Sequence, residues 1–150
     1  MFSDLNLPQV SLRLGKRGEV LHVFDPLRRK WLVLTPEEWV RQHWLHFLHT
    51  SKAYPLSLMR VESGMQWNNI PLRTDLICYR PDGHPQLLLE CKAPEVRLTE
   101  TAFDQLMRYQ RQLNAANMVL SNGIQHFLAR EHGAFREVGF DEIPLYIYGC

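Results

Sequence analysis

The sequence has little cysteine, and this limits the class of protein. Its 150 residues include three cysteines, Cys78, Cys91 and Cys150, which form no CxxC pair. An odd number without that spacing excludes a disulfide framework and a zinc ribbon. Because Cys78 and Cys91 lie in apolar runs, we expect them to be buried free thiols in a cytoplasmic protein.

Long apolar runs, repeats and flexible linkers are also absent. No stretch approaches the roughly 18 apolar residues that a membrane-spanning helix needs, and residues 1–10 lack the cationic start and apolar run of a signal peptide. We therefore expect one domain over residues 1–150, with residues 1–18 loosely ordered and no membrane as partner.

A net charge is nearly absent as well. Seventeen Lys and Arg residues against 16 Asp and Glu residues give +1, which argues against binding of polyanions by bulk electrostatics. The composition, 45% hydrophobic and 22% charged, excludes a disordered chain. Any nucleic-acid function must therefore come from a local site.

Helix and strand signals cover most of the chain. Thr35, Pro36 and Glu38 form a helix start of the capping-box type, which predicts a helix over residues 35–49, and a second helix is expected over 99–113. The run Leu87-Leu88-Leu89 is typical of a central strand that is buried on both faces. The strands expected are 19–24, 31–34, 58–62, 65–68, 71–80, 85–93, 118–121 and 124–129, with residues 68–69 as a turn and the apolar tail 145–148 as a last core strand rather than a partner surface.

The order of the core elements is helix, three strands, helix and strand. This order predicts a mixed α/β (α+β) sandwich with a central mixed sheet flanked by helices.

Two carboxylates and a lysine give the clearest chemical signal. Glu90 and Lys92 are two residues apart on one strand, so their side chains share a face. If the preceding strand pairs as expected, Asp75 lies near Glu90 on that face. Hard oxygen ligands with open positions suit Mg²⁺, and Lys92 could orient a water molecule or stabilise a phosphoryl transition state. An ordinary Lys–carboxylate pair at a strand end remains open as the alternative.

Gln105 and Tyr109 extend this constellation. They are four residues apart on the helix that follows the Glu90–Lys92 strand, so they share one helix face. We expect that face to differ from the apolar stripe of Phe103 and Leu106 and to reach the same site.

With these residues in view, the sequence resembles the PD-(D/E)XK nuclease superfamily. It is most similar to the N-terminal nuclease domain of type I restriction enzyme R subunits, in a stand-alone bacterial form. The resemblance covers residues 20–130, and its matching segments are 24–31, 34–42, 73–75, 89–94 and 105–109.

The resemblance implies a restriction-endonuclease-like core with a Mg²⁺-dependent site, where Mn²⁺ can substitute, for cleavage of DNA phosphodiesters. It implies Asp75, Glu90 and the backbone carbonyl of Cys91 as metal ligands and Lys92 as the catalytic lysine. Gln105 and Tyr109 would match the QxxxY motif of the family, positioning the water or the scissile phosphate and contacting the DNA backbone.

An acidic residue on the first helix often completes the metal site in this family, and Glu38 is our choice. Its capping position explains the residue equally well, and Glu37 and Glu62 are weaker choices. Thr74 stands where the signature has proline, as in many members. The translocating helicase of an R subunit is missing, so we do not expect a complete restriction motor.

Other polar residues have simpler interpretations. His43, His46 and His49 recur every three residues, but nothing completes a metal set, so we interpret them as a solvated or partly packed face. The cations Lys16, Arg17, Arg28, Arg29 and Lys30, beside Trp31, fit either a phosphate-backbone contact or a solvated hairpin end. For phosphate contacts near the proposed site we favour Arg73, Arg108 and Arg111.

The sequence is consistent with two functions of different class. The first is a metal-dependent deoxyribonuclease, which could act as a homodimer because cutting two strands needs two sites. The second is a non-catalytic module that keeps the nuclease fold to bind DNA or a partner subunit.

Overall fold

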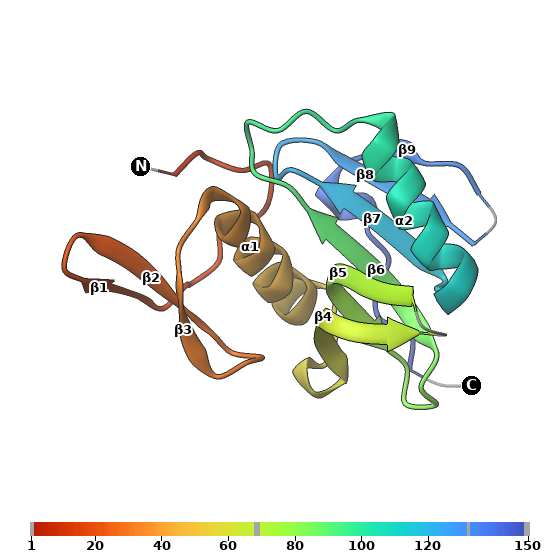
Figure 1. The fold of residues 1–150 in the computed structure, drawn as a ribbon, viewed down its shortest axis with the longest axis horizontal. Coiled ribbons are helices and arrows are strands. Elements are labelled where there is room, and N and C mark those ends of the chain that lie inside the picture. Colours follow the sequence, from red (N-terminus) through yellow and green to blue (C-terminus); the bar gives the residue numbers. More distant parts are fainter. Residues whose placement is uncertain (1, 68–69, 132, 149–150) are drawn as a thin grey trace.

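The computed structural model describes residues 2–67, 70–131 and 133–148, and for residues 62–67 and 70–73 it describes the backbone alone. Over this range the chain forms two α-helices and two β-sheets (Figure 1). The helices are α1 (Pro36–Ser51) and α2 (Glu100–Leu113). Neither has the length and apolar character that crossing a membrane would require.

A six-stranded mixed sheet forms the centre of the molecule. Its strand order is β4-β5-β6-β7-β8-β9, in which β6 and β7 are parallel and all other neighbours are antiparallel. The mixed α/β class and the order of the core elements are confirmed. The strands are β4 (Met59–Trp67), β5 (Ile70–Tyr79), β6 (Pro85–Cys91), β7 (Asn117–Ser121), β8 (His126–Arg130) and β9 (Arg136–Val138).

The two helices cover opposite faces of this sheet. Side chains of α1, with Trp44 and Leu48 fully buried, pack in one core cluster with Leu76, Leu87 and Leu89. The opposite cluster, which includes Leu106 of α2, contains the residues of alternate parity, such as Ile77, Leu88 and Met118. Strand alternation therefore builds two cores, and β6 is buried on both faces as expected.

A separate antiparallel three-stranded sheet precedes α1. It consists of β1 (Leu14–Arg17), β2 (Val20–Asp25) and β3 (Lys30–Val33), in the order β1-β2-β3. Figure 1 shows it on the side of α1 away from the six-stranded sheet. Residues 2–13 have no regular structure but are anchored, since the Asn6 amide donates a hydrogen bond to the Gly123 carbonyl at 2.8 Å.

Several strand predictions need correction. Residues 58–62 and 65–68 are not two strands, because β4 runs continuously from Met59 to Trp67; the expected turn at 68–69 lies outside the described residues. The tail 145–148 is not a strand. Its buried Tyr146 is fixed by a hydrogen bond from its amide to the Lys52 carbonyl at 2.8 Å, while Leu145, Ile147 and Tyr148 are exposed.

Candidate active site where strands β5 and β6 diverge

Asp75 lies where the ladder between β5 and β6 ends. The last residue pair in this direction is Leu76 with Leu89. Beyond it, Asp75 Oδ2 accepts a hydrogen bond of 2.6 Å from the Cys91 amide. A side-chain carboxylate thus satisfies a strand amide that would otherwise need a backbone partner. The carboxylate is held in one orientation at the end of the paired region.

Glu90 adjoins Asp75 in a desolvated position. Burial, then the negative charge of Asp75, raises the pKa of Glu90 to about 8, while Lys92 acts in the opposite direction. The Lys92 Nζ lies 3.7 Å from Glu90 Oε1, and these side chains are 32% and 17% exposed. The structure therefore brings together the three residues of the predicted carboxylate–carboxylate–lysine group.

An arginine connects this group to α1. Arg41 Nη2 lies 4.0 Å from Asp75 Oδ1, and its Nε lies 3.2 Å from Glu38 Oε2. Glu38 Oε1 also lies 3.5 Å from Arg28 Nη2, in the turn between β2 and β3. Burial raises the pKa of Glu38 in spite of the two arginines.

Both carboxylate oxygens of Glu38 thus lie beside arginine side chains. Its role as a metal ligand stays a prediction. Its capping position is confirmed in part, since its amide donates to Thr35 Oγ1 at 3.0 Å. The carboxylate of the neighbouring residue, Glu37, acts on the site instead, because its charge raises the pKa of Glu90. The sequence carries a signal for this: Glu37 precedes Val40 by three residues and Trp44 by seven, on the stripe of α1 that faces the sheet.

Gln105 and Tyr109 are adjacent on α2. Gln105 Nε2 lies 3.4 Å from Tyr109 Oη and donates to it, so the expected shared face is present. Gln105 is exposed, but Tyr109 is only 9% exposed and belongs to the same core cluster as Leu106. The expectation that Tyr109 lies apart from the apolar stripe was therefore wrong, because its ring packs while its hydroxyl contacts Gln105.

The arginines expected at a phosphate are less tightly connected to the site. Arg108 and Arg111 are exposed on α2, and within the described ranges neither forms an ion pair. The side chain of Arg73 lies outside the described residues, as does that of Glu62. Their roles at DNA stay predictions.

The two cysteines expected to be buried, and one histidine of α1, have packed side chains. Cys78 and Cys91 are buried free cysteines, and burial raises the pKa of each thiol. His43 is packed on α1, with its Nδ1 2.8 Å from the Trp39 carbonyl, and burial lowers its pKa.

The donor chemistry of the site fits a hard divalent cation. Among the residues that the structure describes, no three His, Cys, Asp or Glu side chains gather as metal ligands, yet Mg²⁺ commonly uses only one or two carboxylates and keeps several waters. Asp75 and Glu90 supply such a pair. Glu90 Oε2 is buried and has no hydrogen-bond partner in the described part of the chain, a costly state for a carboxylate that a cation would relieve.

Comparisons with known proteins give the family and the fold. The fold is similar to the crystal structure of a candidate nuclease belonging to DUF820 from Anabaena variabilis ATCC 29413, with a TM-score of 0.53 and 10% identity over 89% of this chain and 84% of that chain. No curated protein matches this chain. A family model described as the N terminus of the type I restriction enzyme R protein matches residues 36–144. The chain therefore belongs to the type I restriction enzyme R protein N-terminal family and is a restriction-endonuclease-like relative of the PD-(D/E)XK nucleases.

Proposed function

We propose that this chain is a metal-dependent nuclease domain that hydrolyses phosphodiester bonds in DNA. The observation that carries the proposal is the site where β5 and β6 diverge: Asp75 is fixed by the Cys91 amide, Glu90 has a buried oxygen without a partner among the described residues, and Lys92 adjoins it. Membership of a nuclease-type family and the fold support this choice over other hydrolytic chemistries.

Asp75, Glu90 and the carbonyl of Cys91 would hold the cation, Mg²⁺ or Mn²⁺. When bound, the cation would neutralise charge on the phosphate and lower the pKa of a water molecule. The hydrogen bond from the Cys91 amide occupies one oxygen of Asp75 and leaves the other directed toward Arg41. This fixed orientation reduces the reorganisation that binding requires.

Lys92 would act on the substrate side of the site. Its ammonium is partly exposed and lies 3.7 Å from Glu90, farther than a tight charge-assisted hydrogen bond. It can therefore turn to a phosphoryl oxygen or an attacking water and stabilise developing negative charge. Gln105, exposed and adjacent to the Tyr109 hydroxyl, would help to position the same water or phosphate.

Nicking of supercoiled DNA tests this function. Wild type is expected to convert the substrate in Mg²⁺ or Mn²⁺ but not in EDTA, and Asp75→Ala and Lys92→Ala are each expected to lower the rate about 100-fold or more. Arg130→Ala serves as a matched control, because it removes an exposed cation at the end of β8. Equal activity in wild type, Asp75→Ala and Lys92→Ala would contradict the assignment of these residues to a nuclease active site.

The rival function is a non-catalytic binding module, and the fact that the described residues supply no third carboxylate ligand favours it. Such a module would bind DNA with an affinity that a chelator leaves unchanged and would show no heat of binding with Mn²⁺. Either a metal-dependent DNA affinity or metal-dependent cleavage would exclude it.

A further inference from the structure

The three-stranded sheet has an inner and an outer face. The register pairs Gly15 with His22 and His22 with Val33, and directly paired residues share a face. The opposite face carries Val23 and Asp25, which are 0% and 1% exposed. The rest of the molecule covers the inner face at Val23 and Asp25, while Leu14 and Leu21 at the far end of that face are exposed. The outer face is open to solvent at Trp31 and Val33.

Trp31 stands on this outer face in a fixed orientation. It is paired with Phe24, whose ring meets the indole edge-on at 5.6 Å between centroids, and the Arg13 guanidinium lies 5.4 Å from the indole centroid. A Cβ on Gly15 would lie 3.1 Å from the six-membered ring, so glycine is what allows the indole to approach the sheet. The indole is nevertheless 44% exposed.

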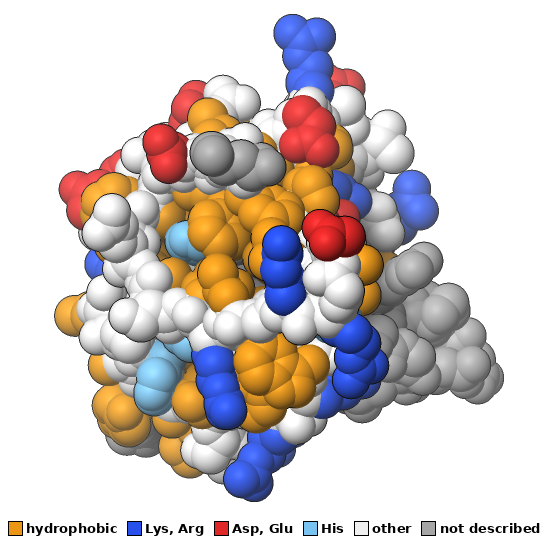
Figure 2. Space-filling view, turned by 90° about the vertical axis from the view of Figure 1, so that its left-hand side faces the viewer, with side chains coloured by type: hydrophobic (Ala, Val, Ile, Leu, Met, Phe, Trp, Pro, Cys, Tyr) orange, Lys and Arg blue, Asp and Glu red, His pale blue; other side chains and the backbone are white. Residues whose placement is uncertain are grey.

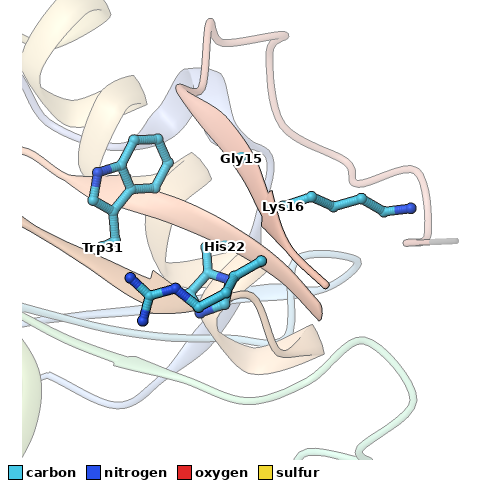
Figure 3. A pocket seen from close by; sticks show the side chains of 5 residues that line it. Gly15, Lys16, His22 and Trp31 are labelled. Atoms are coloured by element: carbon cyan, nitrogen blue, oxygen red, sulfur yellow. The ribbon is translucent and has the colours of Figure 1, made fainter. Parts of the chain in front are cut away.

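A pocket of about 290 Å³ opens beside the indole. It is lined by Gly15, Lys16, Arg17, His22 and Trp31. Figure 3 shows the indole and the His22 imidazole side by side on the strands, with the Lys16 side chain extending away from the indole. The volume is near the lower end of the range for small-ligand pockets, which suits one nucleotide-sized group at a time.

The charge of the molecule is concentrated in this sheet. Residues 13–33 hold six of the 17 Lys and Arg residues and two of the 16 Asp and Glu residues, so their formal charge is +4 and that of the rest of the chain is −3. Figure 2, which looks onto this side of the molecule, shows Lys and Arg side chains among exposed hydrophobic ones. An anionic partner would therefore meet this sheet first.

We propose that the outer face of the three-stranded sheet binds single-stranded DNA, with a base stacked on Trp31 and a phosphate beside Arg17, which shares this face through its pairing with Val20. The proposal rests on the nuclease function above. An exposed aromatic platform with flanking cations is the arrangement that holds single strands without base-pair recognition, whereas a duplex buries its base faces. The family match begins at residue 36, so this sheet lies outside the matched region.

A chain of ion pairs connects this sheet to the candidate active site. Arg28, in the turn between β2 and β3, contacts Glu38, which contacts Arg41 and through it Asp75. A DNA strand bound on the sheet would therefore lie next to α1, whose Arg41 contacts Asp75 of the candidate site.

Fluorescence anisotropy tests the proposal in EDTA, where cleavage plays no part. The probes are a labelled oligothymidylate of roughly 15 nucleotides and a duplex of the same length. Trp31→Ala is expected to weaken single-strand binding about 10-fold, and Arg17→Ala is expected to reduce the slope of log affinity against log salt by about 0.7. The matched controls, Tyr148→Ala and Arg130→Ala, remove an exposed aromatic ring and a cation from other elements and should bind as wild type does.

The outcomes separate this proposal from the function on which it rests. Lys92→Ala should lose cleavage and keep single-strand affinity, so loss of cleavage without loss of binding supports both. Wild-type affinity in both Trp31→Ala and Arg17→Ala, with melting temperatures unchanged, would overturn the binding face whatever the cleavage assay shows. Tighter binding of duplex than of single strand, or self-association that only Trp31→Ala abolishes, would also overturn it.

Discussion

Arg41 contacts two carboxylates that belong to different parts of the protein. It lies 3.2 Å from Glu38 on its own helix and 4.0 Å from Asp75 on β5. Burial opposes its charge, but the charges of Glu38 and then Asp75 outweigh burial and raise its pKa. Arg41 therefore compensates buried negative charge on both sides of the junction between α1 and the sheet.

Replacement of Arg41 tests this compensation. Because removal of one partner leaves Glu38 and Asp75 short of positive charge, Arg41→Met should lower the free energy of unfolding by about 2–4 kcal/mol. The double variant Arg41→Met/Glu38→Met should recover part of that loss, since it removes the uncompensated carboxylate as well. Guanidinium denaturation measures both, and an Arg41→Met variant within about 0.5 kcal/mol of wild type would contradict the assignment.

At Glu90, the requirements of stability and of the proposed function oppose each other. Its carboxylate is buried beside Asp75, and burial raises its pKa to about 8. Without metal, Glu90→Gln should therefore stabilise the protein by about 1–2 kcal/mol, as substitutions that relieve a strained active site do. Thermal unfolding in EDTA checks this, and a lower melting temperature for Glu90→Gln would show that the negative charge is compensated within the fold.

The residues of the site differ in how well the sequence predicts them. Alternation along a strand was enough to group Glu90 with Lys92 and to expect Asp75 beside them. It could not decide between Glu37 and Glu38, because adjacent helix residues face different neighbours and the partners of Glu38, Arg28 and Arg41, come from separate elements.

At the scale of elements, a buried network joins α1, β7, β8 and the N-terminal segment. His126 Nε2 donates to the Asn6 carbonyl at 2.7 Å, and its Nδ1 lies 2.8 Å from Ser121 Oγ. That oxygen already accepts from Trp44 Nε1 and from the Gly123 amide, each at 2.9 Å. The serine must therefore donate its one proton to Nδ1, which requires a neutral imidazole.

This network predicts a loss of stability in mild acid. Burial lowers the pKa of His126 below 6.5, so below that pH the unfolded chain binds more protons than the folded one. Stability should be complete above about pH 7 and fall as the pH drops through the unfolded pKa toward the lower folded one.

Urea denaturation between pH 5 and 8 measures this dependence. His126→Gln should show a slope reduced by up to about 1.4 kcal/mol per pH unit. Some slope should remain, because burial also lowers the pKa of His43 and His46. Parallel curves for wild type and His126→Gln would show that His126 does not titrate between the two states.

Elements with strong local signals were predictable, and elements defined by distant partners were not. The start of α1 follows from Thr35 and Pro36, and α2 ends at Asn114 with φ 52°, in the left-handed region that commonly ends helices. By contrast, β1 and β9 are short and mostly exposed, and they exist because β2 and β8 offer them an edge. The strand expected in the tail does not form, because Tyr146 packs on Tyr54 rather than pairing in a sheet.

At the scale of the whole molecule, the two sheets differ in the charges that they carry. The six-stranded sheet carries the carboxylates of the candidate metal site, while the three-stranded sheet carries most of the excess positive charge. A net charge of +1 conceals this separation, because the two parts nearly cancel. Composition therefore argues against bulk electrostatic binding, but only the topology shows that most of the positive charge gathers on one sheet, where we propose that a DNA strand binds.

The most direct measurement for the central claim is a calorimetric titration of Mn²⁺ into wild type and Glu90→Gln, with Mg²⁺ as competitor. The account predicts a single site in wild type that Mg²⁺ competes for, and an affinity at least about 10-fold weaker in Glu90→Gln, since one of two carboxylate ligands is lost. No binding by wild type, or equal affinity in the two proteins, would contradict the assignment of Asp75 and Glu90 as the metal site.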